Sequence, residues 1–305
     1  MEHSTTRDPM ARGRATPGAC GPTRRFSPAF DPYALFMARA RWSFGAKGRR
    51  WLLLGALVVV GIGWLVRHEL TARGGPSDTP CQATVAGKIV RLDPEQARNA
   101  TTIAAVGKQF GLPDHAVTVA LATALQESQL HNLPGGDRDS LGLFQQRPSQ
   151  GWGAPADIMR PSHAAASFYR HLTDVPNWES LSLTQAAQAV QRSALPDGYA
   201  QWDPPARLLA RALTGELGAA FACRSAPPTS PLNTAALASA IQRELGAPGI
   251  GQAVEPAHGW LIASWLIGHA SDYGIKAVTF DGHRWSGDSG TWSFRQGIGL
   301  TVSVE

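Results

Sequence analysis

This sequence lacks the motifs that usually mark metal, nucleotide and serine-hydrolase sites. Its nine histidines occur neither in His-Glu-x-x-His nor at a Cys/His spacing suited to zinc. It has no glycine-rich phosphate loop and no Gly-x-Ser-x-Gly segment. We therefore expect neither a bound metal nor a cofactor.

The chain also lacks an evenly basic character, although its formal charge is +5. Residues 1–73 hold twelve Lys/Arg and four Asp/Glu, whereas residues 74–305 hold sixteen and nineteen. The basic excess therefore belongs to the N-terminal segment, and the larger part of the chain is mildly acidic. We expect no nucleic-acid partner.

Only one apolar run is long enough to be considered as a membrane anchor. Residues 51–66, WLLLGALVVVGIGWLV, carry no charge and lie between Arg49-Arg50 and Arg67. They fall short of the roughly 20 residues that span a bilayer, but flanking Arg and Trp side chains can snorkel and lengthen the span. A cleaved signal peptide is disfavoured because a long tail precedes the run and no small-x-small site follows it. The basic neighbouring residues argue against a buried core helix.

The charges around this run predict its orientation. Ten Lys/Arg precede it and few directly follow it, so the positive-inside rule places the N-terminus in the cytoplasm. We expect a disordered basic cytoplasmic tail over residues 1–50, a transmembrane helix over 51–67 and a linker over 68–80. The bulk of the chain would then lie outside the cell membrane, in a single-pass protein.

Cysteine is scarce, with three residues in the whole chain. Cys20 falls in the expected cytoplasmic tail, whereas Cys81 and Cys223 fall outside and bracket the central part of the chain. An oxidising envelope would permit a disulfide between them, which would stabilise the fold by roughly 4–5 kcal/mol in the chain-entropy model. Two independent thiols are the alternative.

Helical patterns dominate residues 81–224, where strand-like alternation is scarce. Asp93-Pro94-Glu95 combines an N-cap, a proline at the first helical position and an acid in the first turn, and the helix that it begins should end at Phe110-Gly111. Further helices are expected over 115–129, 161–173, 183–192 and 205–217. The expected fold class is mainly α.

A proline-rich break at 227–231 indicates a second linker, over residues 225–234. Beyond it, helices are expected over 235–245 and 259–273. Short strands follow from residue 276, with Asp281-Gly282 as a turn. Residues 235–305 should therefore form a small α+β domain, with the tryptophans 260, 265, 285 and 292 in its core. This domain could also dock a protein partner.

Glu127 is the candidate for acid chemistry. It closes a nearly uncharged helical segment, AVTVALATALQES. Glycoside hydrolysis needs a carboxylic acid that stays protonated near neutral pH, and burial among apolar groups raises the pKa of a glutamate in the required direction. A carboxylate at such a helix end is either half-buried with a function or solvated, and the helix alone does not distinguish these alternatives.

Together with the segment that follows it, Glu127 resembles part of the signature of a known family. Glu127-Ser128 closes the helix, and Gly142-Leu143-Phe144-Gln145 follows after a loop with strong helix breakers. This ordered pair resembles the lysozyme-like superfamily, specifically the soluble lytic transglycosylase and goose-type lysozyme branch. The resemblance covers about residues 100–146 and implies a lysozyme-like helical domain over 81–224 that acts on the glycan strands of peptidoglycan.

Carried over by position, the resemblance makes Glu127 the general acid/base. Gln145 would line the sugar cleft, and Ser128 would support the glutamate or the acetamido group. In the transglycosylase branch one Glu suffices, because the sugar's own 6-hydroxyl closes a 1,6-anhydro ring. A hydrolase would need a second carboxylate to activate water. Asp137 and Asp139 are the near candidates, although an Asp-Arg-Asp loop is more typical of a salt-bridged or solvated turn.

One departure from the family concerns activity. Many transglycosylases have a late Tyr-Asn-Ala-Gly segment near the catalytic Glu, and residues 190–194 at that place read VQRSA. Gln191 and Tyr199 are the candidate replacements. The alternative function is therefore a catalytically inactive scaffold that binds peptidoglycan or an envelope complex. An open groove around Glu127 and Gln145 would favour the enzyme, and a filled groove or a salt-bridged Glu127 would favour the scaffold.

Tryptophan residues offer a further, weaker indication of sugar binding. Trp152, Trp178 and Trp202 could each stack on a sugar ring. Because tryptophan more often forms part of a protein core, we expect no more than one of the three to do so.

Overall fold

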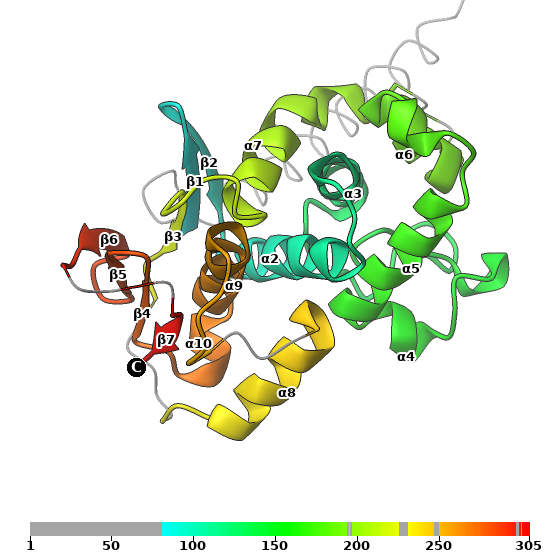
Figure 1. Cartoon of the computed structure of the whole chain (residues 1–305). Helices are drawn as coiled ribbons and strands as arrows, with labels where there is room; N and C mark the ends of the chain where they lie inside the picture. Colours follow the sequence, from blue (N-terminus) through cyan, green and yellow to red (C-terminus); the bar gives the residue numbers. More distant parts are fainter. Residues whose placement is uncertain are drawn as a thin grey trace, which may run out of the picture. The chain divides into compact units, whose positions relative to one another are not determined.

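The computed structural model describes residues 81–193, 195, 197–225, 231–246, 250–296, 299 and 301–305. The expected cytoplasmic tail, transmembrane helix and first linker lie outside these residues. Helices predominate in the described part, and they are accompanied by two small antiparallel sheets (Figure 1). Within the same residues, no helix is both long and apolar enough to cross a membrane.

The helices are of two kinds. The α-helices, in chain order, are α2 (Pro94–Gln109), α3 (Asp114–Ser128), α4 (Pro155–Ile158), α5 (Pro161–Thr173), α6 (Leu183–Gln191), α7 (Asp203–Leu213), α8 (Thr234–Leu245), α9 (Pro256–Gly268) and α10 (Ala270–Tyr273). The 3-10 helices are η1 (Pro148–Gln150), η2 (Trp178–Ser180) and η3 (Ala200–Trp202).

The strands form two sheets. The first contains β1 (Cys81–Val85), β2 (Lys88–Leu92) and β3 (Phe221–Cys223) in the order β2-β1-β3. The second contains β4 (Ala277–Phe280), β5 (His283–Ser286), β6 (Thr291–Phe294) and β7 (Ser303–Val304) in the order β6-β5-β4-β7.

Local signals place most helix ends where the sequence predicts them. Asp93 caps α2 by accepting a hydrogen bond from the backbone N–H of Gln96, whose side chain accepts one from the Asp93 backbone in return. The helix α5 has the predicted bounds. The helix α7 begins at Asp203 and ends at Leu213, four residues before the predicted end at 217.

The first sheet was not predicted. β1 and β2 form a hairpin, and β1 also pairs with β3 near the end of the central part of the chain. Cys81 and Cys223 are direct cross-strand partners and form a disulfide, as predicted. The bond closes a loop between residues 142 positions apart, which corresponds to about 5 kcal/mol in the chain-entropy model.

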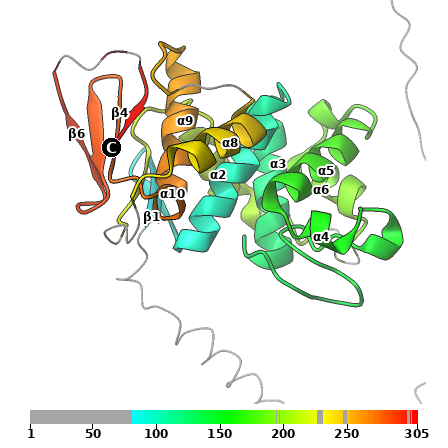
Figure 2. The same cartoon turned by 90° about the horizontal axis from the view of Figure 1, so that it is seen from below.

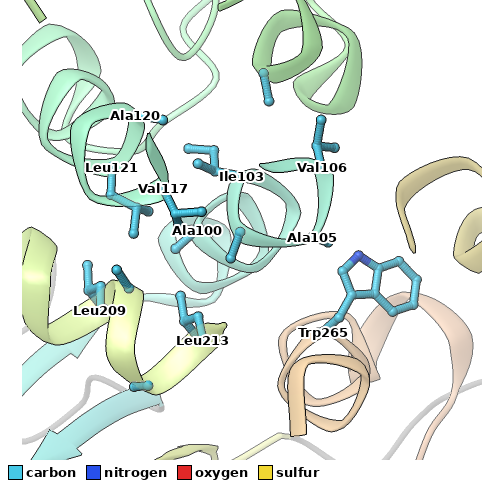
Figure 3. Close-up of a cluster of buried hydrophobic side chains, with 14 of the residues drawn as sticks. Ala100, Ile103, Ala105, Val106, Val117, Ala120, Leu121, Leu209, Leu213 and Trp265 are labelled. Atoms are coloured by element: carbon cyan, nitrogen blue, oxygen red, sulfur yellow. The ribbon is translucent and has the colours of Figure 1, made fainter. Parts of the chain in front are cut away.

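The helix α3 lies at the centre of the helical part. Every residue from Ala116 to Leu125 is buried, because α2, α5, α6 and α7 all pack against it. A helix that is apolar on every side is stable only when it is covered in this way. Figure 3 shows side chains of α2, α3 and α7 in contact in this core, among them Ile103, Leu121 and Leu209.

The C-terminal residues share this core. The helix α9 packs on α2 and also on β4, so that α2 lies between the C-terminal elements and the other helices (Figure 2). The approach is close, because a Cβ atom on Gly268 would lie 2.5 Å from Thr101 Oγ1. The sequence predicts separate units on either side of residues 225–234, whereas the described residues on both sides belong to one compact unit.

The tryptophans of the C-terminal region are mostly core residues, as expected. Trp260, Trp265 and Trp285 are buried, and Trp292 is partly buried against the same core. Trp285 and Trp292 also reach the first sheet, where their Nε1 groups donate hydrogen bonds to the carbonyls of Cys223 and Phe221.

Candidate functional site

An open cleft of about 780 Å3 contains the carboxyl group of Glu127. Its lining comes from four segments that are far apart in the sequence. They are the end of α3, the segment 145–152, the turn after α5 and the end of α6. The cleft therefore depends on the packing of α5 and α6 around α3, and Gln145 lines it together with Glu127.

Glu127 lies in the last turn of α3 and is half-buried. The hydroxyl of Tyr199 donates a hydrogen bond of 2.7 Å to its Oε1 atom. Burial raises the pKa of Glu127 above its ordinary value of 4.5, and hydrogen bonds from Tyr199 and Gln191 offset part of this effect. The ion pairs formed among the described residues do not include Glu127. The local environment thus favours the neutral acid.

The two candidate replacements for the late family motif both lie at Glu127. Tyr199 is fully buried, and burial together with the neighbouring Glu127 raises its pKa far above 10, so the phenol stays protonated and donates. Gln191 ends α6, and its Nε2 group donates a 2.8 Å hydrogen bond to the carbonyl of Phe144. An amide nitrogen has two hydrogens, so Gln191 can hold the loop and still face Glu127.

Gln145 lies in the cleft in a constrained conformation. Its φ of 46° is in the left-handed region, which is uncommon for a residue other than glycine. Its Nε2 group donates a 3.1 Å hydrogen bond to the carbonyl of Gly142. On the other side, a Cβ atom on Gly136 would lie only 1.7 Å from Gln145 Oε1. Because Gly136 has no side chain, the amide group of Gln145 fits beside its backbone.

Ser128 is placed differently from the other predicted site residues. Its side chain is buried, and its hydroxyl lies 2.7 Å from the carbonyl of Leu143 and 3.1 Å from that of Ala124. It is not among the residues that line the cleft. Its visible role is to join the end of α3 to the segment that carries Gln145.

The two aspartates of the 137–139 loop do not line the cleft. Asp137 is exposed. Asp139 accepts hydrogen bonds from Arg147 Nε and from the backbone N–H of Ser149, both at 2.8 Å, and these contacts hold its pKa well below 3.8. Asp139 thus braces the loop, which agrees with the salt-bridged interpretation of this motif. The carboxylate that does line the cleft with Glu127 is Asp174, which sequence reasoning missed.

One of the three tryptophans faces the cleft. Trp152 lines it and stacks on His171, with ring centroids 4.0 Å apart. Trp178 is instead buried and stacks on His115. Trp202 is partly buried and donates through Nε1 to Gln126 Oε1 at 2.8 Å.

Arg147, His171 and Arg192 also line the cleft, and no sequence motif had marked them. Arg192 directly follows Gln191 in the chain, which could have suggested it. His171 lies in the last turn of α5, where helical spacing alone gives no sign of a neighbouring cleft. In the described part of the chain, the cleft included, no cluster of three His, Cys, Asp or Glu side chains is arranged to hold a metal ion.

Comparison of the chain with protein-family models and with curated proteins gives no match. The family resemblance therefore rests on the segments that surround Glu127 and Gln145.

Proposed function

We propose that this chain cleaves the glycan strands of peptidoglycan with Glu127 as general acid/base, in a lysozyme-like domain held outside the cell by a single membrane helix. The observation that carries the proposal is the environment of the Glu127 carboxyl group. It is a half-buried carboxyl group with a raised pKa, and it lines an open cleft. A general acid for glycosidic cleavage needs these properties.

The chemistry follows from the contacts of the carboxyl group. Because the Tyr199 hydroxyl donates to Oε1, we assign the proton of the neutral acid to Oε2. This proton passes to the glycosidic oxygen as the bond from that oxygen to the anomeric carbon breaks. Glu127 is then a carboxylate, and hydrogen bonds from Tyr199 and Gln191 stabilise its charge. It next removes a proton from the nucleophile that attacks the anomeric carbon.

Two nucleophiles fit this scheme. The 6-hydroxyl of the same sugar would give a 1,6-anhydro product, and water would give hydrolysis. The placement of the two loop aspartates favours the route that needs one carboxylate. Asp139 is held by Arg147 and Ser149, and neither Asp137 nor Asp139 lines the cleft where water would have to be activated. Asp174 is the residue to test for the hydrolytic route, since it is a second carboxylate in the lining.

The second candidate function is an inactive scaffold that binds glycan in the same cleft. The missing Tyr-Asn-Ala-Gly segment favours it. Against it, Tyr199 and Gln191 provide a hydroxyl and an amide at Glu127. Glu127 also has no ion-pair partner among the described residues, and it lines an open cleft. Both observations favour the enzyme.

The test compares the full chain, purified in detergent, with its Glu127→Gln variant on isolated peptidoglycan. Glu179→Gln is the matched control, because Glu179 is exposed and does not line the cleft. Wild type and control should release soluble fragments, and Glu127→Gln should release almost none. Equal release by all three proteins would refute the assignment of Glu127. Binding without release by any of them would favour the scaffold.

The products then decide the reaction type. Mass spectrometry of the released muropeptides distinguishes anhydro ends from reducing ends. Anhydro ends would identify a lytic transglycosylase, and reducing ends would identify a hydrolase.

A further inference from the structure

A second half-buried carboxyl group, that of Glu244, lies on α8, which packs on α2, and it also reaches a side chain of α9. Its Oε2 atom is 2.8 Å from Thr102 Oγ1 and 2.8 Å from Trp265 Nε1. Thr102 Oγ1 is also 3.3 Å from Nε2 of His269, the residue that ends α9. These four side chains connect α2 with α8 and α9, which follow it more than 120 residues later in the chain.

The hydrogen atoms available to this cluster can be counted. His269 Nδ1 lies 3.0 Å from the carbonyl of Trp265, which can only accept, so Nδ1 carries a hydrogen. In a neutral imidazole Nε2 is then an acceptor, and it needs the Thr102 hydroxyl hydrogen. If Glu244 were a carboxylate, Trp265 Nε1 would still donate to its Oε2 atom, but the single Thr102 hydrogen could serve only one neighbour. Donated to Glu244, it would leave His269 Nε2 without a donor; donated to His269, it would leave Thr102 Oγ1 and Glu244 Oε2 facing each other at 2.8 Å with no hydrogen between them, and either arrangement is costly.

One additional proton removes this conflict. A protonated Glu244 donates to Thr102 Oγ1, and Thr102 then donates to His269 Nε2. Trp265 Nε1 still donates to the acid, so every polar atom that the cluster buries has a partner. Placing the proton on His269 would also complete the chain, but it would leave two charges of opposite sign in the interior, where desolvation is expensive.

We propose that the Glu244–Thr102–His269 cluster binds one proton, carried by Glu244 as a neutral acid, and that this proton fastens α8 to α2 and α9. The cluster is a pH-sensitive latch. It does not involve Glu127, and it would hold whichever reaction the cleft performs.

The surroundings of the cluster agree with this proton position. Burial is the main cause that raises the pKa of Glu244, and burial lowers the pKa of His269 to about 3. The charged and titratable groups that act on the two come from three elements. They are Arg98 of α2, Arg243 of α8, and Asp272 and Tyr273 of α10. Arg98 and Asp272 form an ion pair of 2.7 Å and offset each other.

The sign of the pH dependence follows from linkage. Because the native pKa of Glu244 is above its ordinary value of 4.5, its contribution to stability is complete below 4.5 and is lost as the pH rises through the native pKa. His269 acts in the opposite direction, since its contribution is present above 6.5 and is lost as the pH falls toward 3. Ionisation of Glu244 at alkaline pH and protonation of His269 at acidic pH therefore each weaken the contacts that hold α8 to α2 and α9.

Infrared spectroscopy of the full chain tests the position of the proton. The comparison uses a Glu127→Gln background, so that the acid of the cleft does not contribute. A protonated carboxylic acid has a carbonyl band that a carboxylate lacks. In spectra recorded over a pH series, this band should persist above the ordinary titration range of glutamate in the control Glu179→Gln and should be missing there in Glu244→Gln. An unchanged band in Glu244→Gln would overturn the proposal.

Thermal unfolding of the full chain tests the latch itself. Glutamine cannot ionise, and its NH2 group can donate to Thr102 but cannot also accept from Trp265 Nε1. Glu244→Gln should therefore have a slightly lower Tm than wild type at mildly acidic pH, and this difference should shrink or reverse at alkaline pH, where wild-type Glu244 ionises. Thr102→Val removes the shared hydroxyl and should lower the Tm, whereas Thr102→Ser keeps the hydroxyl and should lower it less. Parallel curves of Tm against pH for wild type and Glu244→Gln would overturn the proposal. If Glu244→Gln does not fold, equal Tm values for Thr102→Val and Thr102→Ser would overturn it instead.

Discussion

Replacing Tyr199 with phenylalanine should shift the upper pH limit of glycan cleavage toward alkaline values. The phenylalanine ring fills the same buried space, so the main change is the loss of the 2.7 Å hydrogen bond to Glu127 Oε1. This bond lowers the pKa of Glu127, and burial raises it. Without the bond the acid should stay protonated to a higher pH. Because the protonated form starts the reaction, the alkaline limb of the rate profile should move upward.

The size of the shift follows from the strength of the lost bond. A hydrogen bond to a charged group contributes roughly 1.5–3 kcal/mol. Tyr199 also donates to the neutral acid, so only the difference between the two protonation states counts, and the lower end of this range applies. Since about 1.4 kcal/mol corresponds to one pH unit, we expect a shift of about one unit. The maximal rate should fall as well, because the carboxylate formed in the first step loses a donor.

The assay is the initial rate of fragment release from peptidoglycan as a function of pH. Tyr169→Phe is the matched control. Tyr169 is equally buried, and its hydroxyl donates a 2.9 Å hydrogen bond to the carbonyl of Ile103. Both variants should lose about 1 kcal/mol of stability. The alkaline limb should move in Tyr199→Phe only. A shift toward acid, or equal shifts in both variants, would refute the assigned role of Tyr199.

Three further predictions concern the cleft and the first sheet. Gly136→Ala should strongly reduce cleavage with a small loss of Tm, because its Cβ would displace the Gln145 amide; Gly135→Ala, whose Cβ meets nothing within 4 Å, should retain activity. Arg192→Gln should weaken binding of carboxylate-bearing glycans more than binding of neutral N-acetylglucosamine oligomers, and added salt should reduce the difference; equal losses on both ligands would contradict this. Reducing the disulfide of the first sheet should lower the free energy of unfolding by up to about 5 kcal/mol, measured by denaturant titration with and without reductant.

The sequence predicted best those elements whose signals are local. The cap at Asp93 fixes the start of α2, and Pro161 fixes that of α5. The first sheet was missed because its strands are short and because β3 pairs with a strand far back in the sequence. Cysteine spacing nevertheless predicted the contact between Cys81 and Cys223, since a disulfide can be anticipated without recognising the strands that carry it.

The candidate site shows the same division between local and distant signals. The two short motifs identified Glu127 and Gln145, and these residues do line one cleft. Trp152 and Asp174 gather there only because the end of α5 packs beside the segment 145–152. A pairwise arrangement of that kind leaves no periodic trace in a single sequence. It therefore had to come from the structure.

The burial of Glu127 depends on the composition of α3. The helix carries small and apolar residues on every side, so no amphipathic stripe shows which face is inward. In the structure this composition allows four helices to pack around α3. At its C-terminal end, Gln191 from the end of α6 and Tyr199 from the segment after it approach the carboxyl group. Desolvation of Glu127 is thus a consequence of how completely the preceding turns are covered. Substitutions that enlarge Ala120 or Ala124, both fully buried, should therefore disturb the pKa of Glu127 by moving the covering helices apart.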